Sequence, residues 1–313
     1  FHVREELRVL SDVLSGPALP MARGPRVMRL REDLQACYGM RYAVPVSSGS
    51  AAIHVALFAA GVGAGDEVIV SPLTDYGSII GIFQLNAIPV FADVLPDSIL
   101  MDVADVKKKI TRRTKAIMPV HNGGYAVDMR ALNRLAKAHD LKVVEDCAQA
   151  HLAVLGKKHL GQYGDISAWS FNESKHMKAG EGGFVLTNKK AMAEAADLFS
   201  DKCYPRFPGA PPTPAFPALN VRLNEISAAL ASVQLKYLPG WIEKRRRFAD
   251  AFHGEIDGVP GICPEAQPRG ARPSYWWVSF AVDREQLGTD AKQFCNMLSE
   301  EGCLLYTSPS PRD

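Results

Sequence analysis

Short apolar runs recur along the first two thirds of the chain, and the first five are continuous and rich in β-branched residues. Continuous runs of this length are typical of strands that are buried on both faces. Helical stretches such as 50–61 and 129–140 lie between some of the runs. This alternation predicts an α/β fold with a largely parallel sheet. The predicted strands are residues 42–48, 66–72, 87–94, 115–121, 141–148, 165–171 and 182–188.

The pattern changes after the last of these strands. A proline-rich loop at 204–220 interrupts it, and a long amphipathic helix is predicted from about residue 225 to residue 252. Residues 274–282 are predicted to form a strand of a smaller α+β domain. The predicted domains are an incomplete N-terminal helical segment at 1–23, a large α/β domain at 24–240 and the truncated start of a small C-terminal domain at 241–302.

The final segment, CLLYTSPSPRD at 303–313, abruptly replaces the helix-and-turn pattern. It resembles the read-through translation of a sequencing adapter, although a natural tail rich in proline and serine has the same composition. We expect an adapter-derived artefact, because of the abrupt change and the match to the adapter. Such a segment is expected to be disordered, because TSPSPRD has almost no apolar surface to offset the entropy of ordering. The chain is therefore expected to be a fragment.

Composition and charge narrow the class of protein. Hydrophobic residues make up 47% of the chain and charged residues 22%, with a net charge of +2, so nothing points to a nucleic acid or an anionic membrane as partner. No apolar run approaches the ~20 residues of a membrane span. The six cysteines lack metal-ligand spacing. They predict reduced thiols in a cytoplasmic enzyme without a metal site.

Candidate chemistry lies where predicted strands end. In SSGSAA at 47–52 a strand gives way to a helix, and the free N–H groups of Gly49, Ser50 and Ala51 can cradle a phosphate. An ordinary N-cap has the same sequence. Asp146 follows another strand, where it can hold a ring nitrogen protonated or cap a helix. Gln149 lies three residues later, within reach of the same ligand.

Two lysines, Lys175 and Lys178, lie in SFNESKHMKAGEGG at 170–183, between two predicted strands. Lysine prefers solvated surfaces, so a solvated turn is one interpretation. A phosphate cradle, a carboxylate for a ring N–H and a lysine for an imine together fit pyridoxal 5'-phosphate, whose ring serves as an electron sink.

In this order and spacing, the motifs resemble those of the DegT/DnrJ/EryC1/StrS family, the fold type I pyridoxal-phosphate aminotransferases. The resemblance runs from about Gly24 to Phe252. It implies that the domain at 24–240 binds the cofactor. The segments that carry it are SSGSAAIHVAL, GAGDEVIVSPLT, IPVFADV, RTKAIMPVH, VVEDCAQAH, GDISAWSF, SKHMKAGEGGFVLTN and NVRLNEISAAL.

The resemblance also assigns roles around the ring. Its spacing from Ser170 and Gly180 makes Lys175 the imine-forming lysine and leaves Lys178 as a solvated residue. Asp146 is implied to be the partner of the pyridine nitrogen, and Gln149 is implied to lie beside the ring hydroxyl.

For the phosphate, the resemblance implies Ser170 together with the backbone at Gly49 and Ser50. Asn220, in LNVR, matches an asparagine that reaches the phosphate of the neighbouring subunit. The resemblance therefore implies a homodimer with shared active sites.

Some positions depart from the family pattern. Many members have an aromatic residue that stacks on the cofactor after the Thr of PLT, where this chain has Asp75 followed by Tyr76. Either Tyr76 covers the ring or the faces of the site differ. His176 adjoins the lysine and is interpreted as a turn residue. His121 matches a recurrent histidine near the active site, and a satisfied strand-end histidine is an equal interpretation.

The implied function is transfer of an amino group from glutamate or glutamine to a keto-sugar, linked to a nucleotide, or to a keto-cyclitol. Such reactions belong to amino-sugar and polysaccharide biosynthesis. In that mechanism Lys175 also carries the proton between substrate and cofactor. The alternatives are a sugar-deoxygenating relative, a branch that has histidine in place of this lysine, and a regulator that binds the cofactor without catalysis.

Overall fold

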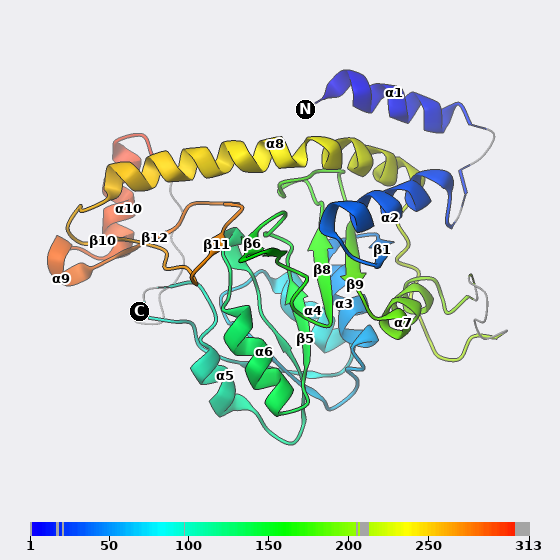
Figure 1. Ribbon diagram of the computed structural model, residues 1–313, viewed down its shortest axis with the longest axis horizontal. Coiled ribbons are helices and arrows are strands. Elements are labelled where there is room, and N and C mark those ends of the chain that lie inside the picture. Colours follow the sequence, from blue (N-terminus) through cyan, green and yellow to red (C-terminus); the bar gives the residue numbers. More distant parts are fainter. Residues whose placement is uncertain are drawn as a thin grey trace.

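A seven-stranded sheet in the order β1-β9-β8-β5-β4-β2-β3 organises the chain (Figure 1). The computed structural model describes residues 2–16, 19–20, 22–96, 98–204, 206 and 213–303. β9 is antiparallel to both of its neighbours, and the pairs from β8 to β3 are parallel. The predicted, mostly parallel sheet is confirmed. Its strands are β1 (Tyr42–Val46), β2 (Glu67–Val70), β3 (Ile88–Phe91), β4 (Thr114–Met118), β5 (Lys142–Asp146), β8 (Ile166–Ser170) and β9 (Gly183–Thr187).

Helices cover both faces of the sheet because successive strand residues point to opposite sides. Ala43 joins one hydrophobic core, and the next residue, Val44, joins the other. The core that contains Ala43 packs against α2 (Pro25–Tyr38), α5 (Val103–Lys109), α6 (Met129–Ala138) and α8 (Glu225–Ile256). The core that contains Val44 packs against α3 (Gly49–Ala59), α4 (Tyr76–Gln84) and α7 (Lys190–Ser200).

The prediction of burial on both faces is wrong for β3. This strand ends the sheet and pairs with β2 alone. Ile88 is 41% exposed and Phe91 is 47% exposed. A continuous apolar run does not reveal whether a strand is central or at the edge, because that depends on strand order.

The long helix α8 joins the sheet to the C-terminal elements (Figure 1). Near its start, α1 (Val3–Leu14) packs Val9 and Val13 against Ala229 and Val233. The domain boundary predicted between residues 240 and 241 falls inside α8, and the division into domains stays a prediction. The remaining elements are β6 (Val154–Leu155), β7 (Lys158–His159), η1 (Asn122–Gly124), β10 (Ile262–Pro264), β11 (Ala271–Arg272), β12 (Phe280–Val282), α9 (Arg284–Leu287) and α10 (Ala291–Glu300).

The strand predicted at 274–282 is shorter than expected. Only Phe280–Val282 forms β12, which pairs with β10. Upstream, the N–H of Ser274 donates to the carbonyl of Gly124, and that of Trp276 donates to Gly123 at 2.8 Å. Hydrogen bonds to this turn replace the ladder of a sheet. Of the tail predicted to be an artefact, residues 304–313 lie outside the described residues.

Among the described residues, no helix has the length and apolar character needed to cross a membrane.

Glu225 joins the first turns of α8 and α2. Its carboxylate accepts hydrogen bonds from the backbone N–H groups of Arg26 at 3.0 Å and Val27 at 2.9 Å. These are unpaired donors at the positive end of a helix, and the acid is 5% exposed. The link ties the N-terminal helices to the element that carries the C-terminal part.

We predict that Glu225→Gln lowers the free energy of unfolding by roughly 1–2 kcal/mol, because a charged acceptor for one buried and one partly buried N–H group is lost. Chemical denaturation measures the change. The control is Glu194→Gln on α7, which removes an exposed ion pair with Lys190 and should change stability by less than about 0.5 kcal/mol. Equal effects of the two substitutions would contradict the prediction.

Candidate active site

The carboxylate of Asp146 lies at the C-terminal end of β5 and is 4% exposed. Its Oδ2 accepts a hydrogen bond from the hydroxyl of Ser78 at 2.6 Å, and its Oδ1 accepts one from the N–H of Ala148 at 3.0 Å. Burial raises the pKa of Asp146, while the Ser78 and Ala148 bonds and the charge of Lys175 act in the opposite direction. This acid is therefore desolvated and suited to a positively charged partner.

Ser78 belongs to α4, and its hydroxyl also lies 2.7 Å from that of Thr74. The two hydroxyls form a short chain that ends on Asp146. The sequence prediction missed both, because serine and threonine in a helix start are ordinary capping residues. Only strand order brings the start of α4 beside the end of β5.

The predicted phosphate ligands meet at the start of α3. Gly49 lies so close to β8 that a Cβ there would approach the Cβ of Ser170 to 2.6 Å. The hydroxyl of Ser50 faces Gly77 at the start of α4 in the same way, at 2.9 Å from a Cβ placed there. The N–H of Ala51 donates to the Ser48 hydroxyl, which caps the helix. Gly49, Ser50 and Ser170 are thus brought together, and their binding of phosphate stays a prediction.

Lys175 lies in the loop after β8 and is partly buried. Its ammonium lies 4.1 Å from the ring centroid of Trp276, whose indole N–H donates to the carbonyl of Ser174. Burial lowers the pKa of Lys175, and the charges of Asp146 and Asp75 partly oppose that shift. Burial thus disfavours the ammonium form of Lys175, and the two carboxylates favour it.

Lys178, predicted to be solvated, is only partly so. Its side chain is 36% exposed and pairs with Glu173 at 3.5 Å. His176, interpreted as a turn residue, is 5% exposed and donates from Nε2 to the carbonyl of Ser274 at 3.1 Å. The loop therefore packs against the segment that follows β11, so it is not a solvated turn.

Gln149 links three parts of the site. Its side-chain oxygen accepts a hydrogen bond from the N–H of Gly123 at 2.7 Å. Its backbone carbonyl accepts a hydrogen bond from the hydroxyl of Ser274. The side chain is 6% exposed. The Gln149 side chain is thus held in one position, and its contact with a ring hydroxyl stays a prediction.

Tyr76 and Asn220 are both exposed. Tyr76 is the first residue of α4 and is 65% exposed, while Asp75 before it caps the helix by accepting from the N–H of Gly77 at 2.7 Å. Asn220 pairs through its backbone with Asp201. The contribution of Tyr76 and Asn220 to cofactor binding stays a prediction.

His151 supports the end of β8, and the sequence analysis did not predict this role. It is fully buried, its Nε2 donates to the carbonyl of Ser170 at 2.7 Å, and its Nδ1 accepts from the hydroxyl of Tyr38 at 2.8 Å. Burial lowers the pKa of His151 to about 4. The neutral ring fixes the end of β8, from which the loop with Lys175 departs.

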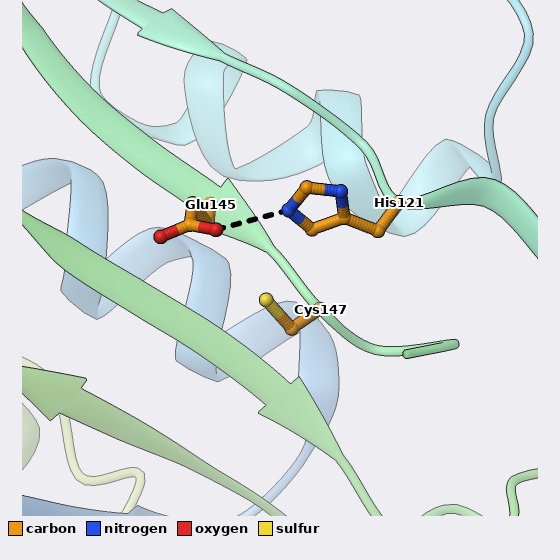
Figure 2. A group of neighbouring side chains, drawn as sticks. All are labelled: His121, Glu145 and Cys147. Carbon is orange, nitrogen blue, oxygen red and sulfur yellow. Dashed lines mark hydrogen bonds and ion pairs between the residues drawn. The ribbon is translucent and has the colours of Figure 1, made fainter. Parts of the chain in front are cut away.

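His121, Glu145 and Cys147 form a buried group beside the site (Figure 2). The Nε2 of His121 donates to Glu145 at 3.0 Å, and its Nδ1 accepts from the N–H of Val127. Glu145 also accepts from three backbone N–H groups, those of Gly161, Tyr163 and Gly164. His121 and Glu145 are thus held by a network of hydrogen bonds, and the pair acts as a structural brace.

A lysine after β8, a buried acid at the end of β5 and a sheet with one antiparallel strand are the arrangement expected of a fold type I aminotransferase. The comparison with known protein families agrees with this class. Residues 2–308 match the DegT/DnrJ/EryC1/StrS aminotransferase family, and the chain belongs to it. The protein is thus an enzyme, an aminotransferase, and the family implies pyridoxal phosphate as cofactor.

The names of known members of the family point to different substrates. The chain is 34% identical over 269 residues to the GDP-perosamine synthase of Vibrio cholerae, covering 84% of this chain and 71% of that protein. It is 35% identical over 260 residues to a putative L-glutamine:3-amino-2,3-dideoxy-scyllo-inosose aminotransferase of Micromonospora echinospora, covering 81% of this chain and 61% of that protein. The structure of S. venezuelae DesV matches with a TM-score of 0.87 at 29% identity, covering 96% of this chain and 78% of that one.

We predict that Ser78→Ala weakens cofactor binding by about tenfold, because Asp146 loses one of its two hydrogen bonds in a desolvated site. Ser78→Thr, which keeps the hydroxyl, should restore most of the affinity. Fluorescence titration of the cofactor-free protein with pyridoxal phosphate measures both. An unchanged dissociation constant in Ser78→Ala would contradict the role.

His151 should make stability fall in acid. Its folded pKa is below the unfolded value of 6.5, so the unfolded chain binds the extra proton as the pH falls from about 6.5 to about 4. That difference removes about 3 kcal/mol of stability across this window. The free energy of unfolding, measured by denaturation across the same range, should lose this part of its pH dependence in His151→Gln. An identical pH slope in variant and parent would show the prediction to be wrong.

Proposed function

We propose that the protein transfers an amino group from glutamate or glutamine to the ketone of a sugar or cyclitol, with pyridoxal phosphate bound beside Lys175. The pairing of a partly buried lysine with the desolvated acid Asp146 carries the proposal. The names of the relatives support the acceptor class, since one is a perosamine synthase and the other acts on an amino-inosose.

The residues fit the cofactor. Asp146 is a buried carboxylate to which a protonated ring nitrogen would bring the missing positive charge. The start of α3 offers backbone N–H groups, and Gly49 leaves room there that a Cβ would fill. The side chain of Gln149 is held by the N–H of Gly123. When bound, pyridoxal phosphate supplies an electron sink for the carbanion that forms next to nitrogen.

Lys175 acts as nucleophile and base. Because burial lowers its pKa, more of its side chain is the neutral amine that can attack a carbonyl and accept a proton. Asp146 and Asp75 hold the protonated form nearby once the proton has moved. With the cofactor bound, Asp146 would hold a proton at the ring nitrogen, and Ser78 fixes the Asp146 carboxylate through its hydrogen bond. A lysine at this position favours amino transfer over deoxygenation, whose branch has histidine there.

A second subunit completes the site in this proposal. Asn220 is exposed on the loop before α8. Two residues later, Arg222 is fixed by an ion pair to Asp201 and by a backbone bridge to Val46 at the end of β1. A fixed backbone with an outward amide suits contact with the phosphate of a partner. The proposed assembly is therefore a homodimer, and its proposed location is cytoplasmic.

We predict that borohydride reduction of the cofactor-loaded protein fixes the cofactor covalently on Lys175. Peptide mapping by mass spectrometry should find the label on the peptide that contains residues 170–183 and place it at Lys175. Lys178→Gln is the matched control, because it removes the neighbouring lysine and should leave the labelling intact. Label at Lys178, or none in the parent protein, would overturn the assignment.

A further inference from the structure

Trp276 lies in the segment between β11 and β12 and is partly buried. Its backbone N–H donates to the carbonyl of Gly123 at 2.8 Å, and its backbone carbonyl accepts from the guanidinium of Arg245 on α8 at 3.2 Å. Its indole N–H donates to the carbonyl of Ser174 at 2.7 Å. Both the backbone and the ring of Trp276 are therefore fixed, and the ring is bonded to the residue before Lys175.

Hydrogen bonds connect Trp276 to Gln149 as well. The turn at 122–124 lies between them, because Gly123 donates its N–H to the side-chain oxygen of Gln149 and accepts from the N–H of Trp276. The indole N–H then continues the series to Ser174. Trp276 thus joins the turn that holds Gln149 to the loop that carries Lys175.

The face of the same ring contacts Lys175. The ammonium lies 4.1 Å from the ring centroid, well inside the ~6 Å over which a cation is attracted to an indole face. A lysine side chain is long and flexible, so a contact that restricts it removes part of the entropy cost of bringing the amine to its reaction position. Trp276 therefore acts on both the backbone and the side chain of this part of the loop.

Other groups around Lys175 also act on its charge. Asp146 and Asp75 favour the ammonium form, and burial opposes it. His151 and His176 are titratable neighbours, and burial lowers the pKa of His151 to about 4 and that of His176 well below its usual value. Both rings are thus neutral near pH 7. The indole face is the group that favours the ammonium form without carrying a charge of its own.

We propose that Trp276 is a positioning residue for Lys175: its indole N–H fixes the loop at Ser174, and its ring face holds the amine in place for the reaction. The inference rests on the function proposed for Lys175. The two contacts use different parts of one side chain, so two substitutions separate them. Trp276→Phe keeps a ring face and loses the N–H, whereas Trp276→Leu loses both and stays apolar.

The test measures two properties of the full chain freed of cofactor. The first is the pH dependence with which acetic anhydride acetylates Lys175, quantified by mass spectrometry of the peptide. Trp276→Leu should move the midpoint to lower pH by about half a unit, because the charged form loses the ring face, and Trp276→Phe should leave it near that of the parent. The second is the rate of covalent loading with pyridoxal phosphate, followed by absorbance. At the plateau of its pH profile, this rate should fall about fivefold in both variants, because the hydrogen bond to Ser174 is lost.

Trp277→Leu is the matched control, because it removes an indole one position further along the chain. The ring of Trp277 lies against Gly123, where a Cβ would approach its Nε1 to 2.4 Å. It also packs on the ring of Trp276 at 4.6 Å, but the hydrogen bonds that hold Trp276 remain in this variant. The midpoint and the loading rate should therefore stay close to those of the parent.

The outcomes separate the two proposals. An unshifted midpoint in Trp276→Leu, or an equal shift in Trp277→Leu, would overturn the role of Trp276. Loading of Trp276→Phe at the parent rate would overturn it too, and this result decides the matter if Trp276→Leu does not fold. A parent protein that is not loaded at Lys175 counts against the proposed function, while the acetylation midpoints still decide whether Trp276 acts on the amine.

Discussion

A carboxylate removed from water at the end of β5 is the constraint on which the rest of the site depends. Asp146 is 4% exposed and would take up a proton if nothing opposed its desolvation. The hydroxyl of Ser78, the N–H of Ala148 and the charge of Lys175 all act against that tendency. Ser78 and Lys175 come from separate segments, so a parallel sheet with short connections is needed to bring them to Asp146.

Glu145, the residue before Asp146 in β5, has a different role. Successive side chains of a strand point to opposite faces, so Glu145 points away from Asp146 and into the other layer. There it accepts four hydrogen bonds, one from His121 and three from the backbone of the turn before β8. Meanwhile the backbone of Asp146 is bonded to Pro119 and His121. Glu145 therefore stabilises the scaffold, and the carboxylate of Asp146 remains available for the reaction.

Much of the fold followed from apolar runs, since each predicted central strand appears within a few residues of its place. Burial of β3 and the long strand at 274–282 were mispredicted, because strand order and contacts with the Gly123–Gly124 turn are not local properties. Spacing within the family resemblance singled out Lys175, while Asp146 and Gln149 were picked from their position at the end of a predicted strand. The supports Ser78 and His151 were missed, because each acts across a large sequence separation and neither lies in a distinctive motif.

The central claim is that Asp146 stays ionised and keeps the ring nitrogen of the cofactor protonated. Nitrogen NMR of the enzyme loaded with ¹⁵N-labelled pyridoxal phosphate tests this directly. The account predicts a protonated ring nitrogen from pH 6 to pH 8.5 in the parent enzyme and an unprotonated one in Asp146→Asn at the upper end of that range. An unprotonated ring nitrogen in the parent enzyme at pH 8 would contradict the account.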